Sequence, residues 1–316
     1  MLLDNLGRHS ELYAFPRETR LIPYLISSLD RFGDLGDDGN FRRLWEEILG
    51  MTVFSYANNN HRPPLPEDWR DYPRDLASVL DGVFRYFAAR EGKQRWCEKS
   101  PQYAQHLTGL AQLFPRARFV HVIRDGRDCA ASFNRRWRRT PELSLYRWKK
   151  VVREGRRQGA QLTGNRYMEV RYEDLTTNPD ANLRQICTFL GVQFEAAVLQ
   201  SAQPYLNTLD LHSTDATPGS LRPNSGAWKT WFAAGSIDRL ERIGGATLDL
   251  FGYETAMPAS DYDPPGYRRK IWTIRDYMVQ FLREIVLRLL GRNKKPWHVI
   301  LSRPFVAYRQ RSENKY

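Results

Sequence analysis

An abrupt change from apolar to charged residues between positions 119 and 138 constrains the fold more than any other feature of the chain. The segment reads FVHVIRDGRDCAASFNRRWR. Its first five residues are mostly β-branched or aromatic, which is typical of a buried parallel strand, and the small residues that follow at helical spacing predict a helix. Asp125 is placed to cap this helix, and Gly126 to allow a tight turn. The pattern therefore predicts a strand, turn and helix of an open α/β sheet.

Two side chains of this unit form a candidate anion site. Arg124 follows the strand directly, and Ser132 lies eight residues later, about two helical turns on. Ligands of open α/β sheets bind at the carboxyl ends of strands, where helix N-termini also favour anions. A guanidinium and a hydroxyl at that edge are suited to clamping a phosphate. An ordinary helix start with surface salt bridges is the alternative reading of the same residues.

The composition indicates a globular enzyme-sized body with a basic tail. The chain has 316 residues, of which 41% are hydrophobic, enough for a sizeable core. Its three cysteines are widely spaced, which predicts no disulfide framework and no metal site and fits a cytoplasmic location. Residues 266–316 hold 13 Lys and Arg against 3 Asp and Glu, so they carry +10 of the net charge of +12. We therefore expect no nucleic-acid partner, and a peripheral membrane or partner contact through 266–316.

A second strand and turn precede the first unit. A short apolar run ends at Cys97, the turn Glu-Lys-Ser-Pro follows, and a helical pattern comes next. One helix and one strand separate Lys99 from Arg124, which is the spacing of adjacent βαβ units. Both cations are therefore predicted to face one crevice at the carboxyl ends of the strands. A solvated surface lysine is the alternative.

The segment that begins at Arg124 resembles the 3′-phosphate-binding segment of sulfotransferases that use 3′-phosphoadenosine 5′-phosphosulfate (PAPS). The likeness rests on Arg-Asp-Gly-Arg-Asp after an apolar strand, on the serine eight positions later, and on the Glu-Lys-Ser-Pro turn. In the family, the lysine of that turn meets the bridging oxygen of the phosphosulfate, which implies this role for Lys99. The resemblance covers roughly residues 2–253. It implies a parallel sheet flanked by helices, related in layout to P-loop NTPases.

An early acidic residue matches tyrosylprotein sulfotransferases and related bacterial enzymes. The stretch Glu-Thr-Arg-Leu-Ile-Pro, which begins at Glu18, is similar to the segment that carries their catalytic base. The resemblance implies that Glu18 takes the proton from the acceptor hydroxyl and that Arg20 helps to position the substrate. Without the resemblance, the preferred interpretation of Glu18 is a glutamate that the dipole at a helix N-terminus favours.

The resemblance implies three further nucleotide contacts. Tyr172 ends a predicted strand and matches a tyrosine that lies near the nucleotide in the family, although a half-buried strand aromatic is an equal alternative. Residues 210–232 lack helical or strand periodicity and predict a loop. Family members carry a similar Ser-Thr stretch, a basic residue and a Trp-Lys pair in a loop over the nucleotide, which makes Ser213 and Arg222 candidates.

One part of the family pattern is not found in the sequence. In the family, a strand and an Arg-Ser-Gly-Thr-Thr loop that cradles the 5′-phosphosulfate come just before the residues that match Leu2 and Leu3. The 316 residues contain no such loop. This favours a start that was assigned too late, with a truncated and inactive relative as the alternative. The expected fold is therefore a P-loop-NTPase-like α/β domain whose first strand and loop are missing, followed by a helical extension.

The predicted domain boundary falls between residues 255 and 256. Residues 1–255 are expected to form the α/β domain, and 256–316 a basic linker, an amphipathic helix and a tail. The helix predicted over 271–290 places its apolar residues on one face and charged residues on the other, and these charges argue against a transmembrane span. We expect the apolar face to dock on the surface of the domain, and contact with an acidic membrane is the alternative.

These observations predict a sulfotransferase that moves the sulfuryl group of PAPS to a hydroxyl of a peptide tyrosine, a carbohydrate or a lipid. The second product is adenosine 3′,5′-bisphosphate, PAPS is the co-substrate, and no metal is expected. As in phosphoryl transfer, cations and amide donors placed in advance stabilise the developing charge. Two alternatives stay open: a catalytically inactive nucleotide-binding or membrane-associated relative, and a nucleotide or sugar kinase, which needs a P-loop lysine and magnesium carboxylates.

Overall fold

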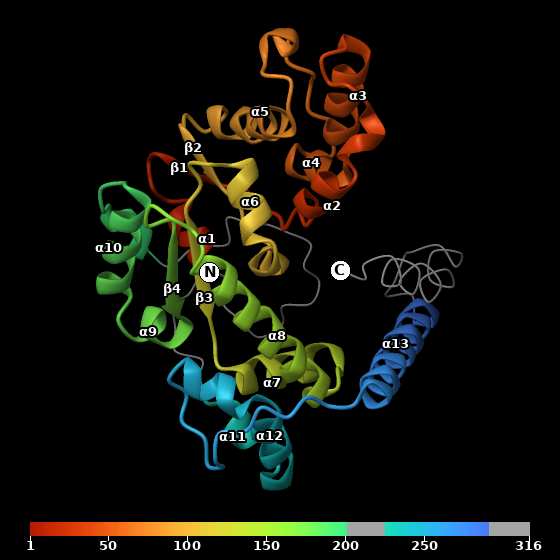
Figure 1. Ribbon diagram of the computed structural model, residues 1–316, viewed down its shortest axis with the longest axis vertical. Helices are drawn as coiled ribbons and strands as arrows, with labels where there is room; N and C mark the ends of the chain where they lie inside the picture. Colours follow the sequence, from red (N-terminus) through yellow and green to blue (C-terminus); the bar gives the residue numbers. More distant parts are fainter. Residues whose placement is uncertain (201–224, 291–316) are drawn as a thin grey trace. The chain divides into compact units, whose positions relative to one another are not determined.

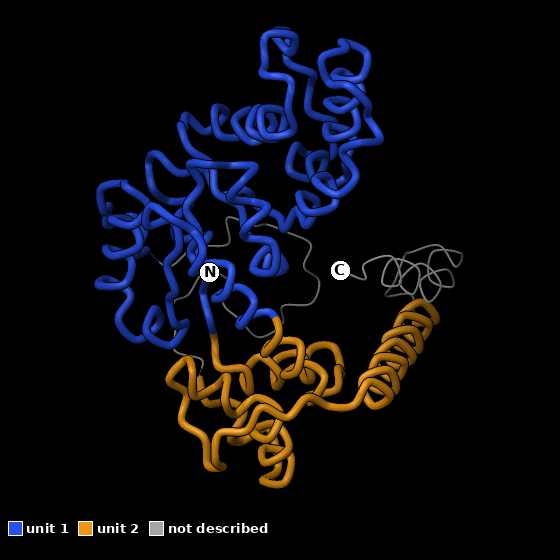
Figure 2. The backbone as a smooth tube through the Cα atoms, viewed as in Figure 1, with its two compact units in different colours: residues 1–123, 151–224 blue, residues 124–150, 225–316 orange. Residues whose placement is uncertain are grey.

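The computed structural model (Figure 1) describes residues 1–200 and 225–290, so the candidates Ser213 and Arg222 lie outside the described residues. The chain forms two compact units (Figure 2). Unit 1 takes its residues from 1–123 and 151–224, and unit 2 from 124–150 and 225–316. The predicted domain boundary after residue 255 stays a prediction.

Four short strands of unit 1 form two parallel pairs (Figure 1). Strand β1 (Leu12–Ala14) pairs with β2 (Arg95–Cys97), and β3 (Phe119–Ile123) pairs with β4 (Tyr167–Arg171). Parallel neighbours need crossover connections, and helices provide them here. The predicted α/β class is thus confirmed. Strand β1, which the sequence pattern did not indicate, supplies the neighbour of the predicted strand that ends at Cys97.

Helices make up most of both units. Those that lie wholly in unit 1 are α1 (Leu2–Leu6), α2 (Ile22–Ser27), α3 (Asp38–Leu49), α4 (Thr52–Ala57), α5 (Leu76–Ala89), α6 (Leu107–Leu113), α9 (Tyr172–Thr177) and α10 (Pro179–Leu190). Those of unit 2 are α7 (Gly126–Trp137), α11 (Trp228–Trp231), α12 (Ala234–Leu250) and α13 (Gly266–Leu289), while α8 (Pro141–Gly159) contributes residues to both units. Short 3-10 helices span Leu29–Phe32, Trp69–Asp71, Pro101–Gln105 and Ala196–Leu199.

An aromatic core fixes the chain that leaves β1. Phe15, the residue after the strand, is fully buried, and its ring centroid lies 5.2 Å from that of Phe84 in α5 and 5.6 Å from that of Phe54 in α4. Both ring pairs are edge-to-face, a geometry that adds about 0.5–1.5 kcal/mol beyond burial of area. The segment that follows Phe15, which carries Glu18, therefore starts from a rigid anchor.

One predicted helix is two helices in the structure. The pattern over residues 40–57 predicts a continuous helix, but α3 ends at Leu49 and α4 starts at Thr52. Met51 between them has ψ of 132°, an extended value that breaks the helical hydrogen-bond ladder. Leu49 and Phe54 are both buried in the same core, so the break lets two successive helices bury their apolar faces against it.

Two glycines bring the C-terminal part of α8 close to β3 and β4. A Cβ atom at Gly159 would lie 2.4 Å from Cζ of Tyr167 in β4, and one at Gly155 would lie 2.7 Å from Cε1 of His121 in β3. Only a residue without a Cβ atom fits at such distances, so the helix can pack directly on these strands.

The start of α7 in unit 2 agrees with the sequence pattern in one respect and differs in another. Asp125 caps the helix as predicted, because its Oδ1 accepts a hydrogen bond of 2.8 Å from the N–H of Arg127. Gly126, however, is not among the residues with positive φ. A Cβ atom at this position would lie 2.5 Å from Cε3 of Trp148 and 2.6 Å from Cδ1 of Leu145 in α8. Close packing of α7 against α8, rather than a tight turn, requires the glycine.

Helix α13 packs on unit 2 through its polar face, which corrects the predicted orientation. Oδ1 of Asp276 accepts hydrogen bonds from the N–H of Thr140 at 2.8 Å and from its hydroxyl at 2.7 Å. Gln280 donates to the carbonyl of Trp137 at 2.8 Å, and Arg283 to that of Arg136 at 3.0 Å. The end of α7 and the start of α8 present backbone groups that lack partners within their own helices, so polar side chains are the better neighbours there.

The apolar residues of α13 are consequently exposed. Ile274 is 62% exposed and Leu282 is 54% exposed, whereas Asp276 is only 8% exposed. The expected docking of the apolar face on the domain surface is therefore wrong. Within the part of the chain that the structure describes, no helix is both long enough and apolar enough to span a membrane.

Replacing Gly126 by alanine tests the packing of α7 on α8. We expect the Gly126→Ala variant to lose about 1–3 kcal/mol of unfolding free energy, because the methyl group must displace Trp148 and Leu145. Gly235→Ala in α12 is the matched control. No heavy atom lies within 4 Å of a Cβ atom there, so this change should be neutral or stabilising. Urea unfolding measures both, and equal stability of the two variants would contradict the close contact.

Candidate active site

The register of β1 and β2 explains how two distant segments meet in unit 1. Ala14 is the register partner of Cys97, and the N–H of Phe15 donates to the carbonyl of Cys97 at 2.8 Å. Parallel strands end at the same edge of a sheet, so the segments that follow Phe15 and Cys97 emerge together. Glu18 comes from the first segment and Lys99 from the second. The structure joins them directly, because Nζ of Lys99 donates to Oε1 of Glu18.

Glu18 is paired with two cations. Besides the contact with Lys99, its Oε2 accepts a hydrogen bond of 2.9 Å from Nε of Arg20. The exposed fractions of the side chains are 24% for Glu18, 54% for Lys99 and 58% for Arg20, so solvent and solutes reach the pair. Partial burial by itself would raise the pKa of Glu18, but the hydrogen bond and charge of Lys99, followed by those of Arg20, lower it overall. Glu18 is therefore an ionised carboxylate at neutral pH.

The adjacent Glu98 holds the two segments together. Its Oε1 accepts hydrogen bonds from the N–H and the hydroxyl of Thr19, both at 2.9 Å, and from the hydroxyl of Ser100 at 2.6 Å. The hydroxyl of Tyr103 lies 2.8 Å from that of Thr19 and completes the cluster. Burial raises the pKa of Glu98, and the hydrogen bonds from Ser100 and Thr19 oppose this. The sequence pattern predicted only that Glu98 belongs to the Glu-Lys-Ser-Pro turn, and no local signal indicated its role.

The backbone at Arg20 is held in an uncommon conformation. Its φ is 56°, in the left-handed region that non-glycine residues rarely adopt. The N–H of Arg20 donates to Oγ of Ser100 at 3.1 Å, so the same cluster that holds Thr19 also fixes this residue. Such conformations cost on the order of 1 kcal/mol or more and concentrate at functional sites.

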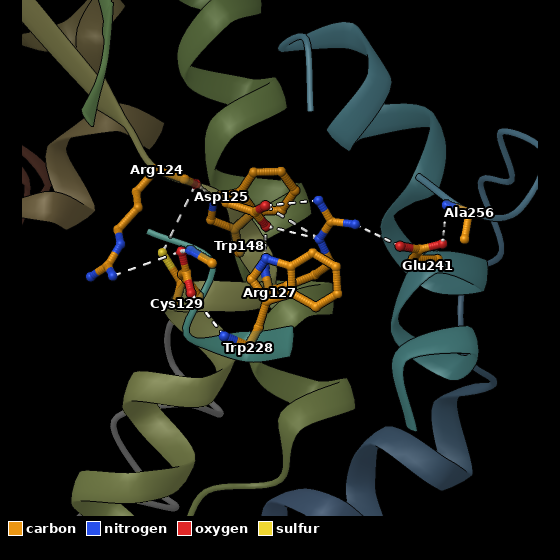
Figure 3. Close-up of polar contacts among 10 residues, drawn as sticks. Arg124, Asp125, Arg127, Cys129, Trp148, Trp228, Glu241 and Ala256 are labelled. Carbon is orange, nitrogen blue, oxygen red and sulfur yellow. Dashed lines mark hydrogen bonds and ion pairs between the residues drawn. The ribbon is translucent and has the colours of Figure 1, made fainter. Parts of the chain in front are cut away.

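The Arg124 segment of unit 2 is also built by specific contacts (Figure 3). Nε1 of Trp148 donates to the carbonyl of Arg124 at 3.0 Å, which fixes the backbone just before α7. The guanidinium of Arg124 forms an ion pair of 3.9 Å with Asp128, and its side chain is 23% exposed. Ser132 lies further along α7 and is half-buried. The N-terminus of a helix of this length favours an anion.

The second arginine of the motif serves the structure of unit 2. Arg127 is buried, with Nη2 at 2.8 Å from Asp125 and Nη1 at 2.5 Å from Glu241 in α12. Its guanidinium carbon lies 3.9 Å from the ring centroid of Trp228, a cation–π contact. Figure 3 shows this guanidinium between the two carboxylates, whereas that of Arg124 points away from them. No local pattern near Glu241 indicated this pairing.

Asp128 and Glu241 bind backbone segments that are distant in the sequence. Oδ2 of Asp128 accepts from the N–H of Gly226 at 2.8 Å, and Oδ1 accepts from that of Trp228 at 3.1 Å. Oε2 of Glu241 accepts from the N–H groups of Ala256 and Met257 at 2.9 and 3.1 Å. The motif therefore ties the start of α11 and the segment after α12 to α7.

Tyr172 directly follows β4, at the carboxyl end of the β3–β4 pair, and is half-buried.

Lys99 and Arg124 belong to different units, so their shared crevice stays a prediction, as do the individual roles of the site residues. Within residues 1–200 and 225–290, no group of three or more His, Cys, Asp or Glu side chains is arranged to hold a metal ion.

The two sites fit a class of enzymes that transfer an anionic group, and comparison with known proteins assigns the family. The model described as "Sulfotransferase family" matches residues 1–196. A putative protein-tyrosine sulfotransferase of Caenorhabditis briggsae is 26% identical over 212 residues, which cover 62% of this chain and 75% of that protein. The chain belongs to the Sulfotransferase family. It is therefore a transferase, and its reaction is the transfer of a sulfuryl group to a hydroxyl acceptor.

Two further similarities support the assignment. The omega-hydroxy-beta-dihydromenaquinone-9 sulfotransferase Stf3 of Mycobacterium bovis is 23% identical over 224 residues, which cover 63% of this chain and 53% of that protein. The solved structure of the sulfotransferase domain from the curacin biosynthetic pathway aligns with a TM-score of 0.51 at 21% identity. This alignment covers 80% of this chain and 93% of the domain, and it supports the fold alone.

Removal of the Glu98 carboxylate tests its role in holding the two segments. In Glu98→Ala, three donors from Thr19 and Ser100 lose their acceptor, so we expect about 1–3 kcal/mol less unfolding free energy. The exposed Glu67 gives the control, because Glu67→Ala should change stability by less than about 0.5 kcal/mol. Equal urea midpoints for the two variants would show that Glu98 does not organise the site.

Removal of Lys99 tests the electrostatics of Glu18. Without this cation, only Arg20 opposes the effect of burial and the pKa of Glu18 should rise, so the carboxylate of the Lys99→Met variant should protonate at higher pH than in the unmodified chain. The chemical shift of the Glu18 carboxyl carbon, assigned through Glu18→Gln, reports the titration. Lys93→Met, which removes a lysine not paired with Glu18, should leave the titration unchanged. An unchanged titration in Lys99→Met would disprove the pairing in solution.

Proposed function

We propose that the chain transfers the sulfuryl group of PAPS to a tyrosyl hydroxyl, with Glu18 as general base and Lys99 as the cation on the leaving oxygen. The observation that carries the proposal is the direct pairing of Glu18 and Lys99 at the carboxyl edge of β1 and β2. A proton acceptor and a cation for a developing anion stand side by side there, and this transfer requires both groups.

The proposed reaction is an exchange of one oxygen for another on sulfur. The acceptor oxygen forms a bond to sulfur, the bond from sulfur to the bridging oxygen of the 5′-phosphate breaks, and the electron pair stays on that oxygen. The proton of the acceptor hydroxyl moves to the carboxylate of Glu18. Adenosine 3′,5′-bisphosphate leaves with the added negative charge, which Lys99 stabilises. The ammonium has three protons, so Lys99 can contact the leaving oxygen while it still orients Glu18.

The lowered pKa of Glu18 favours a phenolic acceptor. A carboxylate that two cations stabilise is a weak base, and proton transfer to it is less unfavourable from an acidic hydroxyl. The tyrosine hydroxyl, with an unperturbed pKa of about 10, is far more acidic than the hydroxyl of a sugar or a lipid alcohol. The similarity to a putative protein-tyrosine sulfotransferase points in the same direction, whereas the similarity to Stf3 keeps a lipid alcohol as the second candidate.

The 3′-phosphate of the donor is assigned to Arg124 and Ser132. Support comes from the anchoring of Arg124 before α7, since a guanidinium with a fixed backbone and a helix N-terminus both favour a phosphate. Tyr172 is proposed to lie near the nucleotide and Arg20 to position the acceptor. Ser213 and Arg222 complete the proposed nucleotide contacts.

Exchange of Glu18 for glutamine separates chemistry from donor binding. Glu18→Gln removes the base but retains the shape of the side chain, so sulfuryl transfer should fall by about 10²-fold or more. Affinity for adenosine 3′,5′-bisphosphate, measured by titration calorimetry, should change little. Transfer is assayed with radiolabelled PAPS and three acceptors: a tyrosine peptide, a sugar and a lipid alcohol. Undiminished turnover would refute the base, and transfer to the lipid alcohol alone would refute the tyrosyl acceptor.

Titration calorimetry of the Arg124→Met variant tests the proposed role of Arg124 in donor binding. Loss of the guanidinium should weaken bisphosphate binding by about 2–5 kcal/mol, as for the loss of one member of a desolvated charge pair. Arg135→Met, in the exposed basic stretch at the end of α7, is the control and should bind the bisphosphate normally. Unchanged affinity in Arg124→Met would remove Arg124 from the donor site.

A further inference from the structure

Helix α13 carries an apolar stripe that faces solvent. The stripe consists of Ile271, Ile274, Met278, Leu282, Val286 and Leu289, each between 51% and 72% exposed. These residues follow one another at intervals of three or four, so they form one line along the helix, about 27 Å long. A contiguous exposed apolar line is uncommon on a water-soluble surface and indicates an interaction site.

Contacts on the opposite side of α13 hold the stripe outward. The buried carboxylate of Asp276 accepts the two hydrogen bonds from Thr140 at the start of α8, and Gln280 reaches the end of α7. The segment just before the helix is also fixed, because the buried ammonium of Lys149 lies 3.0 Å from Asp261 and 2.5 Å from Asp263. Rotation of the helix to bury the stripe on unit 2 would strip Asp276 of its donors, which is costly for a buried charge.

Basic residues flank the stripe on both sides. With about 100° between successive residues, Arg268 projects on one side of the stripe and Lys270 on the other, and both are exposed. The guanidinium of Arg275 instead donates to the hydroxyl of Thr140 at 2.9 Å and pairs with Asp276 at 3.4 Å. Asp276 lies on the opposite, buried face, and Glu284 is the other acidic residue of the helix. A second copy of the helix would bring like charges together, whereas an anionic surface would pair with them.

We propose that α13 lies flat on an anionic membrane surface, with the apolar stripe in the region between headgroups and acyl chains. Such helices combine an apolar face with lysine and arginine at its borders and do not span the bilayer. Anionic headgroups lie at the level of Arg268 and Lys270 when the stripe is immersed. The docking is a property of unit 2 and does not depend on the identity of the sulfuryl donor or acceptor.

Vesicle sedimentation with the full chain tests the proposal. The chain should sediment with vesicles made of equal parts phosphatidylcholine and phosphatidylserine, and much less with phosphatidylcholine alone. Added salt should weaken the binding. Equal binding to both kinds of vesicle, or binding to neither, would overturn the proposal.

Two leucines provide a matched pair of variants. Leu282 lies in the stripe and Leu250 ends α12, and they are 54% and 48% exposed. Leu282→Asp should weaken vesicle binding by about ten-fold or more, because an acidic side chain would have to enter the apolar layer. Leu250→Asp introduces the same charge elsewhere in unit 2 and should bind normally. Both replaced residues are well exposed, so thermal unfolding of the variants should match that of the unmodified chain.

Replacing the basic residues beside the stripe measures how much their charge contributes to vesicle binding. Arg268→Gln combined with Lys270→Gln should weaken binding to the anionic vesicles by about five-fold for each charge removed. Analytical ultracentrifugation tests whether a second copy of the chain binds to the stripe instead of a membrane. A concentration-dependent dimer that Leu282→Asp dissociates would assign the stripe to a second copy and overturn the membrane proposal, as would unchanged vesicle binding by Leu282→Asp.

Discussion

The half-buried carboxylate of Glu98 is the constraint on which the site in unit 1 depends. It receives both polar hydrogens of Thr19 and the hydroxyl of Ser100, and Ser100 in turn receives the N–H of Arg20. Burial raises the pKa of Glu98, and the hydrogen bonds from Ser100 and Thr19 oppose this rise. The exposed pair of Glu18 and Lys99 would contribute little stability by itself. Its geometry is imposed by the cluster beside it, which also holds Arg20 at a φ of 56°.

In unit 2, the charged residues of the motif at 124–128 have two kinds of role. Most of them stabilise the structure, and Arg124 is proposed to bind the donor. Arg127 is buried between two carboxylates and under an indole ring, and Asp128 accepts two backbone N–H groups near α11. Removal of one member of such a buried pair typically costs about 3–5 kcal/mol. The guanidinium of Arg124 pairs with Asp128 at 3.9 Å but points away from Asp125 and Glu241 (Figure 3), and its side chain is 23% exposed, which is consistent with the proposed contact with a phosphate. Arg127, Asp125 and Asp128 of this motif therefore hold the structure that surrounds Arg124.

The sequence predicted the elements whose signals are local. The strand at Phe119–Ile123 and the cap at Asp125 both follow from short-range patterns. Strand β1 did not, because three residues are too few for a period, and the structural roles of Glu98 and Glu241 depend on neighbours distant in the sequence. The periodicity of α13 was correct, but the pattern cannot tell which face a neighbour covers. There the unpaired backbone ends of α7 and α8 selected the polar face.

A double-mutant cycle on Glu18 and Lys99 tests the central claim that the two side chains act on one transferring group. The rate of sulfuryl transfer is measured for the unmodified chain, Glu18→Gln, Lys99→Met and the double variant under the same donor and acceptor concentrations. Residues that act as a unit give grossly non-additive losses. We therefore expect the double variant to be about as slow as the slower single variant. If the activation free energy of the double variant rises by the sum of the two single effects, Glu18 and Lys99 act independently on the transfer, which would contradict the claim.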